Sequence, residues 1–173
     1  MKLFSRVIEM LFLVGVIVFF ASCSEKKIEV PKGIGAPKLD VRDVRTGKTI
    51  DISQFNGKVV FVNFWASWCP PCKEEMPSIE ALHRELMNKD QFLIVTILYK
   101  DDAKTATDYM RAHNYTFPVF TDNDGISAIN YGVTGVPETY LIDKKGMQRR
   151  RVIGPADWNS SEAKAFINAL LSE

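Results

Sequence analysis

Apolar residues follow two different spacings in the middle of the chain, and the two spacings predict different elements. Residues 58–65, "KVVFVNFW", are almost continuously apolar and rich in β-branched side chains, which is typical of a strand buried on both faces. From Pro70 to about Asn88 the apolar residues recur at helical spacing, which predicts an amphipathic helix. Residues 92–98, "FLIVTIL", predict a second buried strand. Strand, helix and strand together indicate a βαβ unit with parallel strands and a right-handed crossover.

Other elements flank this unit on both sides. Residues 39–52 alternate apolar and polar side chains around Thr46–Gly47, which predicts an N-terminal β-hairpin extension. The later pattern predicts a helix, a short strand, a few helical turns, a hairpin and a last helix, at 103–113, 117–122, 126–131, 138–154 and 160–171. Asn159 is predicted to cap the last helix, with Glu162 completing a capping box. The predicted fold class is α/β, with a central mixed sheet and helices on both faces.

The first 22 residues are typical of a targeting segment. Lys2 and Arg6 provide a basic start, and Met10–Phe20 is an unbroken apolar run that ends in small residues before Cys23. A membrane-spanning helix needs about 20 apolar residues, so this run favours a cleaved signal peptide over a permanent anchor.

The sequence "FASC" is similar to a bacterial lipoprotein signal, in which Cys23 becomes the lipidated first residue of the mature protein. Two other interpretations stay open: a signal that is retained or cleaved elsewhere, and a buried helix. We therefore divide the chain into a lipoprotein-type signal peptide at 1–22, a tether at 23–36 and one domain at 37–173. The tether is predicted from its lysine, proline and glycine residues. Both signal interpretations place the domain outside the cytoplasm, in a periplasm or on the outer face of the cytoplasmic membrane.

Length and composition are those of an ordinary globular protein. The 173 residues suffice for one domain with a full core, and 46% hydrophobic with 25% charged residues is an average mixture. Without residues 1–22 the chain has 20 basic and 20 acidic residues. This balance gives no support to a nucleic-acid partner.

Two cysteines, Cys69 and Cys72, follow the first buried strand directly. A C-x-x-C pair at a strand-to-helix junction is a redox signal, and its spacing lets a disulfide close with little backbone movement. Free N–H groups and the helix dipole favour a thiolate at Cys69. Pro70 and Pro71, between the cysteines, are tolerated because the first helical turn does not use their missing N–H groups.

Two other interpretations of the cysteine pair remain. A purely structural disulfide would close a loop of only a few residues, so it would stabilise the fold little. A tetrahedral zinc site needs about four ligands, and only His83 and His113 are available as further histidines. Redox chemistry is therefore the favoured interpretation, and no metal site is expected.

The sequences "GKVVFVNFWASWCPPCKEEMP" and "GVPETYLID" resemble those of the thioredoxin-like reductases of bacterial cytochrome c biogenesis, the ResA, TlpA and CcmG group of redoxins. The resemblance extends from about Gly35 to the end of the chain. It implies a thioredoxin-like fold with an insert after the first βαβ unit. It also implies that the protein needs no cofactor besides the redox-active disulfide Cys69–Cys72.

The resemblance assigns roles by position. Cys69 is similar to the attacking thiol and Cys72 to the resolving thiol. Pro77 resembles the proline that kinks the active-site helix, and Pro137 resembles the cis-proline that faces the dithiol. Such a proline would expose the neighbouring backbone at Val136 for pairing with an extended client segment.

The residues around the dithiol and the cis-proline are expected to contact the client: Trp68, Pro70, Pro71, Val136, Pro137 and Glu138. Trp68 directly precedes the first cysteine, so we expect its indole to cover the sulfurs and its fluorescence to report the redox state. Glu138 directly follows the cis-proline and is expected to influence the choice of partner.

Two further residues distinguish the chain from thioredoxin itself. Asn63 stands where thioredoxin has a buried aspartate, and Glu75 occupies the position of the active-site glutamate of the cytochrome-biogenesis branch. Glu75 lies one helical turn past Cys72, within reach of it. Its carboxylate would raise the pKa of the thiols and accept the Cys72 proton during resolution. The alternative is that Glu75, like Glu74, is a solvated acid near the start of the helix.

These observations lead to the hypothesis of an extracytoplasmic, membrane-tethered thiol-disulfide oxidoreductase that reduces client disulfides. The resemblance implies that the client is apocytochrome c and that the electrons come from a transmembrane thiol carrier. One alternative reverses the direction, to an oxidant or isomerase of secreted proteins, and a peroxidase is less favoured. Another alternative is a non-enzymatic module that delivers copper or haem.

Overall fold

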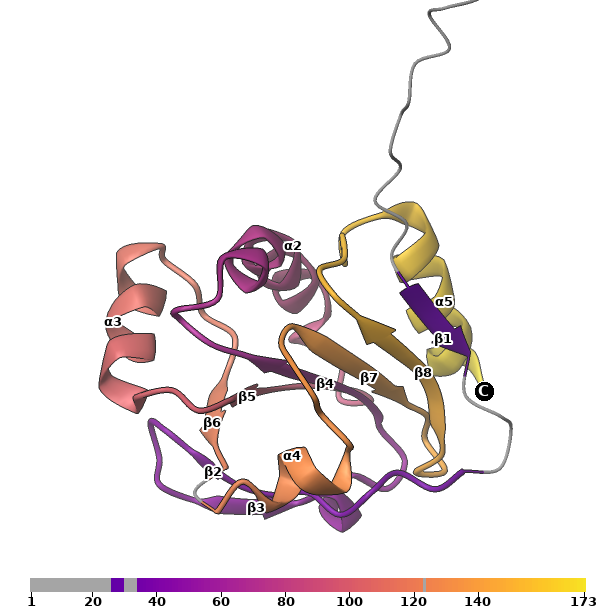
Figure 1. Cartoon of the computed structure of the whole chain (residues 1–173). Coiled ribbons are helices and arrows are strands. Elements are labelled where there is room, and N and C mark those ends of the chain that lie inside the picture. Colours follow the sequence, from indigo (N-terminus) through magenta and orange to yellow (C-terminus); the bar gives the residue numbers. More distant parts are fainter. Residues whose placement is uncertain (1–25, 30–33, 123) are drawn as a thin grey trace, which may run out of the picture.

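A mixed β-sheet runs through the protein and carries helices on both faces (Figure 1). The computed structural model describes residues 26–29, 34–122 and 124–173. Over these residues the sheet has eight strands in the order β1-β8-β7-β4-β5-β6-β2-β3. The strands are β1 Lys26–Glu29, β2 Asp40–Asp43, β3 Thr49–Asp51, β4 Val59–Trp65, β5 Phe92–Leu98, β6 Val119–Thr121, β7 Glu138–Ile142 and β8 Gln148–Ile153. The helices are η1 Ile52–Phe55, α2 Pro70–Leu86, α3 Ala103–Ala112, α4 Ile126–Asn130 and α5 Ser161–Ser172.

Strand β4 lies in the middle of the sheet, and all seven of its residues are buried. It pairs in parallel with β5, from Val59 opposite Phe92 to Trp65 opposite Leu98, and antiparallel with β7. Alternate β4 residues point into two cores, because successive side chains of a strand face opposite sides. One core packs under α2, α3 and α5, and the other lies on the face of α4 and η1. The nearly continuous apolar run therefore reflects burial of the strand on both faces, as the sequence predicted.

The βαβ unit forms as predicted, with α2 between β4 and β5. Pro70 occupies the first turn of α2, and Pro77 lies inside the helix. The segment that follows the unit adds α3, β6 and α4 before the chain returns to the centre of the sheet at β7. The predicted N-terminal hairpin is formed by β2 and β3. It extends the sheet beyond β6 through antiparallel pairing of β2 with β6.

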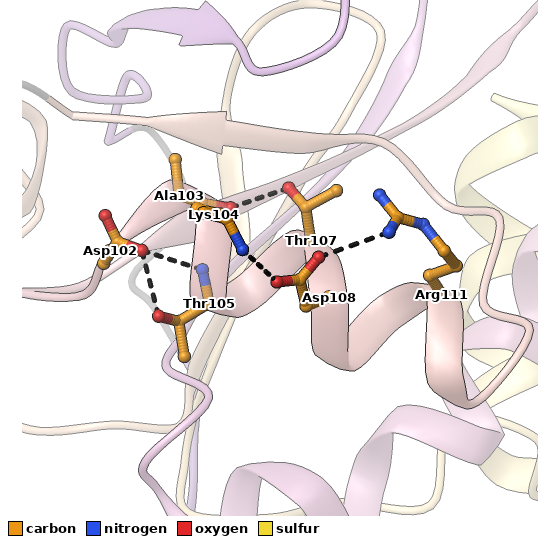
Figure 2. A network of polar contacts seen from close by, with 7 residues as sticks. All are labelled: Asp102, Ala103, Lys104, Thr105, Thr107, Asp108 and Arg111. Carbon is orange, nitrogen blue, oxygen red and sulfur yellow. Dashed lines mark hydrogen bonds and ion pairs between the residues drawn. The ribbon is translucent and has the colours of Figure 1, made fainter.

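Helix α3 begins right after the loop that ends β5, and polar contacts define its first turns (Figure 2). The Asp102 carboxylate caps the helix by accepting bonds from the Thr105 N–H and hydroxyl, at 2.8 and 2.9 Å. On the solvent side, Asp108 pairs with Lys104 and Arg111. These contacts define the first turns of the helix, and the preceding residue, Asp101, accepts a bond from Ser67 N in the loop before the cysteines.

The predicted cap of the last helix is wrong by one residue. Ser160, not Asn159, is the N-cap of α5, and its hydroxyl accepts a bond from Ala163 N at 3.2 Å. Asn159 N instead donates to the Asp157 carboxylate in the preceding turn, at 3.0 Å. Glu162 consequently occupies the second helical position, and no capping box forms with it.

Part of the predicted tether is a strand. Lys26–Glu29 form β1, which pairs antiparallel with β8 at one edge of the sheet. The predicted signal peptide, at 1–22, and the predicted lipidation site, Cys23, lie outside the described residues. In the stretches that the structure covers, no helix has the length and apolar character needed to cross a membrane.

Candidate active site

Cys69 and Cys72 form a disulfide at the amino end of α2, the helix that follows β4 in the chain. Their Cα atoms are 5.3 Å apart. Cys69 is the N-cap of the helix, and its Sγ accepts a hydrogen bond from Cys72 N at 3.2 Å. Cys72 is fully buried, and Cys69 is 2% exposed. After reduction, the same N–H group and the helix dipole would stabilise a thiolate at Cys69.

The loop before Cys69 is held by the residues that follow β5. Ser67 N donates to the Asp101 carboxylate at 2.6 Å, and the Trp68 indole N–H donates to the Lys100 carbonyl at 3.1 Å. Trp68 is 55% exposed, one of the few large apolar side chains on the described surface. Its contact with solvent fits the predicted role in client binding, and the covering of the sulfurs by its indole stays a prediction.

The peptide bond between Val136 and Pro137 is cis, as the resemblance implied. The Val136 carbonyl oxygen lies 3.5 Å from Cys69 Sγ, so this loop faces the dithiol. Val136 is partly exposed beside the disulfide, like Pro71, and Pro70 is exposed. Trp68, Pro70, Pro71 and Val136 therefore offer accessible surface around the sulfurs, whereas Pro137 is buried.

Glu75 is buried, with 2% of its surface exposed, which rules out the interpretation as a solvated acid. Its Oε1 accepts a bond from Asn63 Nδ2 at 2.8 Å. Its Oε2 accepts bonds from Ala156 N at 3.2 Å and from Trp158 Nε1 at 3.3 Å. Its neighbour Glu74 is exposed. The carboxyl group therefore lies inside the protein, one turn past Cys72 on the same helix.

Asn63 connects the glutamate to the cis-proline strand. Besides its bond to Glu75, its Nδ2 donates to Thr139 Oγ1 at 2.8 Å. Asn63 lies opposite Thr139 in the pairing of β4 with β7. The side chain that replaces the aspartate of thioredoxin thus serves as a donor to Glu75.

Glu138 is fully buried on the other face of the sheet. Its Oε1 accepts a bond from the Tyr140 hydroxyl at 2.5 Å and forms an ion pair with Arg151 Nε. Burial, followed by the bond to Glu138, raises the pKa of Tyr140, so its hydroxyl keeps the proton at neutral pH. The same hydroxyl lies 2.6 Å from the Tyr131 carbonyl. The Glu138 carboxylate faces the interior, so an effect on partner choice would act through the loop rather than by direct contact.

Sequence reasoning missed Trp158 and Arg151, which contact the two buried glutamates. Trp158 lies 83 residues from Glu75 along the chain, and no local pattern connects the two. Arg151 belongs to a run of three arginines inside a predicted strand. Such a run is unusual next to buried strands, and this is a signal from which an internal ion pair could have been predicted.

In the part of the chain that the structure describes, no group of three or more acidic, histidine or cysteine side chains is arranged so that it could hold a metal ion. The reactive groups described at this site are the Cys69–Cys72 disulfide and the carboxyl group of Glu75.

Comparisons with known proteins identify the family of the chain. A family model described as Redoxin matches residues 31–167. The chain is 35% identical to thiol-disulfide oxidoreductase ResA of Bacillus thuringiensis subsp. konkukian over 158 residues, which cover 88% of each chain. It is 32% identical to thiol:disulfide interchange protein DsbE of Pseudomonas aeruginosa, covering 85% of this chain and 82% of that one. A crystal structure from Chlorobium tepidum, assigned as a thiol:disulfide interchange protein DsbE, superposes with a TM-score of 0.72 at 28% identity, covering 82% of this chain and 99% of that one.

Proposed function

The chain belongs to the Redoxin family and is a thiol-disulfide oxidoreductase with a thioredoxin-like fold, and from this premise we propose that it reduces disulfides in client proteins. The observation that carries the proposal is the position of the Cys69–Cys72 disulfide. It lies at a helix amino terminus, faces a cis-proline loop, and is followed one turn later by the buried Glu75.

The proposed cycle has two steps. The Cys69 thiolate attacks one sulfur of the client disulfide, which forms a mixed disulfide and expels the other client sulfur as a thiolate. Cys72 then loses its proton to Glu75, and its thiolate attacks Cys69 Sγ. This second attack restores the Cys69–Cys72 disulfide and releases the client thiolate. Two electrons pass to the client, and its two thiolates take up two protons, one that Glu75 received from Cys72 and one from solvent.

The direction toward reduction rests on the surroundings of Glu75. A carboxylate near the dithiol disfavours a second negative charge, whereas a strong oxidant stabilises its thiolate. The resolving step also needs a proton acceptor inside a buried site. The hydrogen bonds to Glu75 orient its carboxyl group from β4 and from the 156–158 loop.

The partners are proposed from the motifs and the named relatives. We infer that the client is a c-type apocytochrome and that a transmembrane thiol carrier reduces the disulfide again. The domain is proposed to work outside the cytoplasm, attached to the membrane by a lipid on Cys23. The supporting observations are "NFWASWCPPC" with "GVPET", and the identities to ResA and DsbE.

The cysteines provide the test. We expect Cys69→Ser to abolish reduction of a disulfide-bridged peptide, and Cys72→Ser to accumulate the mixed disulfide, which non-reducing electrophoresis and mass spectrometry would detect. An active Cys69→Ser protein would exclude the mechanism.

The reduction potential tests the direction. The soluble domain, including β1, would be equilibrated in thiol buffers and its thiols counted by alkylation. A value near about −270 mV supports a reductant, and a value near about −120 mV would make the protein an oxidant.

A further inference from the structure

The cis-proline loop is anchored at both of its ends by one side chain. The chain leaves α4 at Tyr131–Gly132, passes Val136 and Pro137, and joins β7 at Glu138. Arg151 on β8 reaches both ends of this segment. Its Nη2 donates to the Gly132 carbonyl at 3.0 Å, and its Nε pairs with the Glu138 carboxylate.

The Tyr140 hydroxyl completes the anchor. It lies 2.6 Å from the Tyr131 carbonyl oxygen and 2.5 Å from Glu138 Oε1. Arg151 lies opposite Tyr140 in the strand pairing, and its guanidinium carbon is 5.6 Å from the centre of the Tyr140 ring. Together, Arg151, Glu138 and Tyr140 form what we call the loop anchor.

Arginine is suited to this position for a geometric reason. Its planar guanidinium directs several N–H groups in fixed directions, so one side chain can bind a carboxylate and a carbonyl at the same time. A lysine ammonium could pair with Glu138 but has no fixed fork with which to reach the Gly132 carbonyl as well. The Arg151 side chain is 26% exposed, so most of it is held against the protein.

The middle of the loop approaches the dithiol, and its ends set that approach. The Val136 carbonyl oxygen is 3.5 Å from Cys69 Sγ, and Thr134 and Gly135 are exposed. A client strand would pair with the backbone at Val136, so a small displacement of the loop would change how the client disulfide meets Cys69.

We propose that Arg151 is a positioning residue for client recognition, because it bridges Gly132 and Glu138 and thereby holds the Val136 backbone beside Cys69. This inference rests on the proposed reductase function. It concerns client binding, and the reaction of Cys69 with a small disulfide should not need it.

The kinetic test compares two substrates. One is a synthetic peptide with an intrachain disulfide between two cysteines that have two residues between them. The other is 2-hydroxyethyl disulfide, which is too small to pair with the loop. For Arg151→Met we expect the KM for the peptide to rise about tenfold with little change in kcat, and the rate with the small disulfide to change less than twofold. Arg151→Lys, which keeps the charge, is expected to raise the KM by about threefold.

Arg149→Met is the matched control. Arg149 is two residues earlier on β8 and also forms an ion pair with a buried carboxylate, that of Asp143. It does not bond the loop ends. We expect its ratio of peptide to small-disulfide reactivity to equal that of the wild type. Urea unfolding of all oxidised proteins would identify losses that come from stability alone.

Hydrogen-deuterium exchange gives a readout that does not depend on activity. In the oxidised protein, the amides of residues 132–136 and of Glu138 should exchange about tenfold faster in Arg151→Met than in the wild type or in Arg149→Met. Unchanged exchange, an equal effect on both substrates, or a wild-type KM in both Arg151 variants would each overturn the inference. A wild type that reduces neither substrate would overturn the proposed function instead, and the exchange data would still decide whether Arg151 holds the loop.

Discussion

Two buried glutamates lie on opposite faces of the sheet near the dithiol, and their partners differ. Glu75, 2% exposed, receives hydrogen bonds from the uncharged donors Asn63, Ala156 N and Trp158. Glu138, fully buried, is paired with the guanidinium of Arg151. The donors to Glu75 come from β4 and the 156–158 loop and orient its carboxyl group, whereas the ion pair of Glu138 joins β7 to β8. We therefore propose proton transfer for Glu75 on one face and anchoring for Glu138 on the other.

The largest effect on stability is expected from a substitution that places a second carboxylate beside Glu75. We expect Asn63→Asp to lower the free energy of unfolding by about 3–5 kcal/mol at pH 7, because it replaces a donor with a buried charge of the same sign. The loss should shrink at acidic pH, where a proton shared by the two carboxyl groups restores a hydrogen bond.

Asn63→Ser is the control, because it removes the amide donor without adding charge. Its expected cost is about 2 kcal/mol, with little dependence on pH. Urea unfolding between pH 4 and 7 would measure both variants, and equal losses at every pH would contradict the electrostatic explanation.

The proton-transfer role of Glu75 is tested by Glu75→Gln. Resolution of the mixed disulfide should slow about 100-fold, equivalent to about 2.7 kcal/mol in the barrier, because the Cys72 proton loses its acceptor. Rapid acid quenching, alkylation and mass spectrometry would follow the step. Glu74→Gln, at the exposed neighbouring position, should resolve at the wild-type rate. A wild-type rate in Glu75→Gln would remove the glutamate from the mechanism.

The anchoring role of Glu138 predicts a different phenotype. Glu138→Gln should lower the free energy of unfolding by about 2 kcal/mol, because Arg151 loses its charged partner. The loss is limited because the Arg151 side chain is 26% exposed, so water can solvate its unpaired guanidinium. The pH profile of resolution should keep its wild-type shape. Glu162→Gln, at an exposed carboxylate 4.0 Å from Arg150, should cost much less. A changed pH profile of resolution in Glu138→Gln would contradict the assignment of different roles to the two glutamates.

Glu80, five residues after Glu75 on α2, gives the smallest expected effect and a reference for acid stability. Burial raises the pKa of Glu80, but bonds from Thr116, Arg84 and Phe117 outweigh it and leave the pKa below its usual range. The stability that it contributes is present above the usual carboxyl pKa and is lost as the pH falls through the lowered value.

Glu80→Gln should therefore cost about 1 kcal/mol at pH 7 and flatten the loss of stability on acidification. Thermal unfolding from pH 3 to 7 would measure this dependence. A variant with the wild-type slope at acidic pH would show that Glu80 does not contribute to it.

Elements with a strong local pattern were predictable from the sequence. Strands β4 and β5 were predicted to within a residue, and α2 was predicted to within two residues, because their apolar spacing follows directly from burial on two faces or on one. The cis bond at Pro137 was predicted too, but by resemblance and not by physical reasoning.

Boundaries and long-range contacts were less predictable. Asn159 and Ser160 are both good caps, and the turn that engages the Asn159 backbone with Asp157 decided between them. Pairing of β1 with β8 could not be expected from a short polar segment, because the edge that receives it is made more than 120 residues later. The partners of Glu75 lie 12, 81 and 83 residues away along the chain.

The sequence by itself determined the α/β order of the elements, the dithiol at the strand-to-helix junction and the chemistry that such a pair can perform. These features depend on neighbours within a few residues. Only the tertiary structure decided that Glu75 is buried with hydrogen bonds from Asn63, Ala156 and Trp158, and that Glu138 on β7 is paired with Arg151 on β8. Burial and charge pairing are properties of the assembled strands and helices. Water is excluded, and side chains that are distant in the sequence meet, only when these elements have packed together.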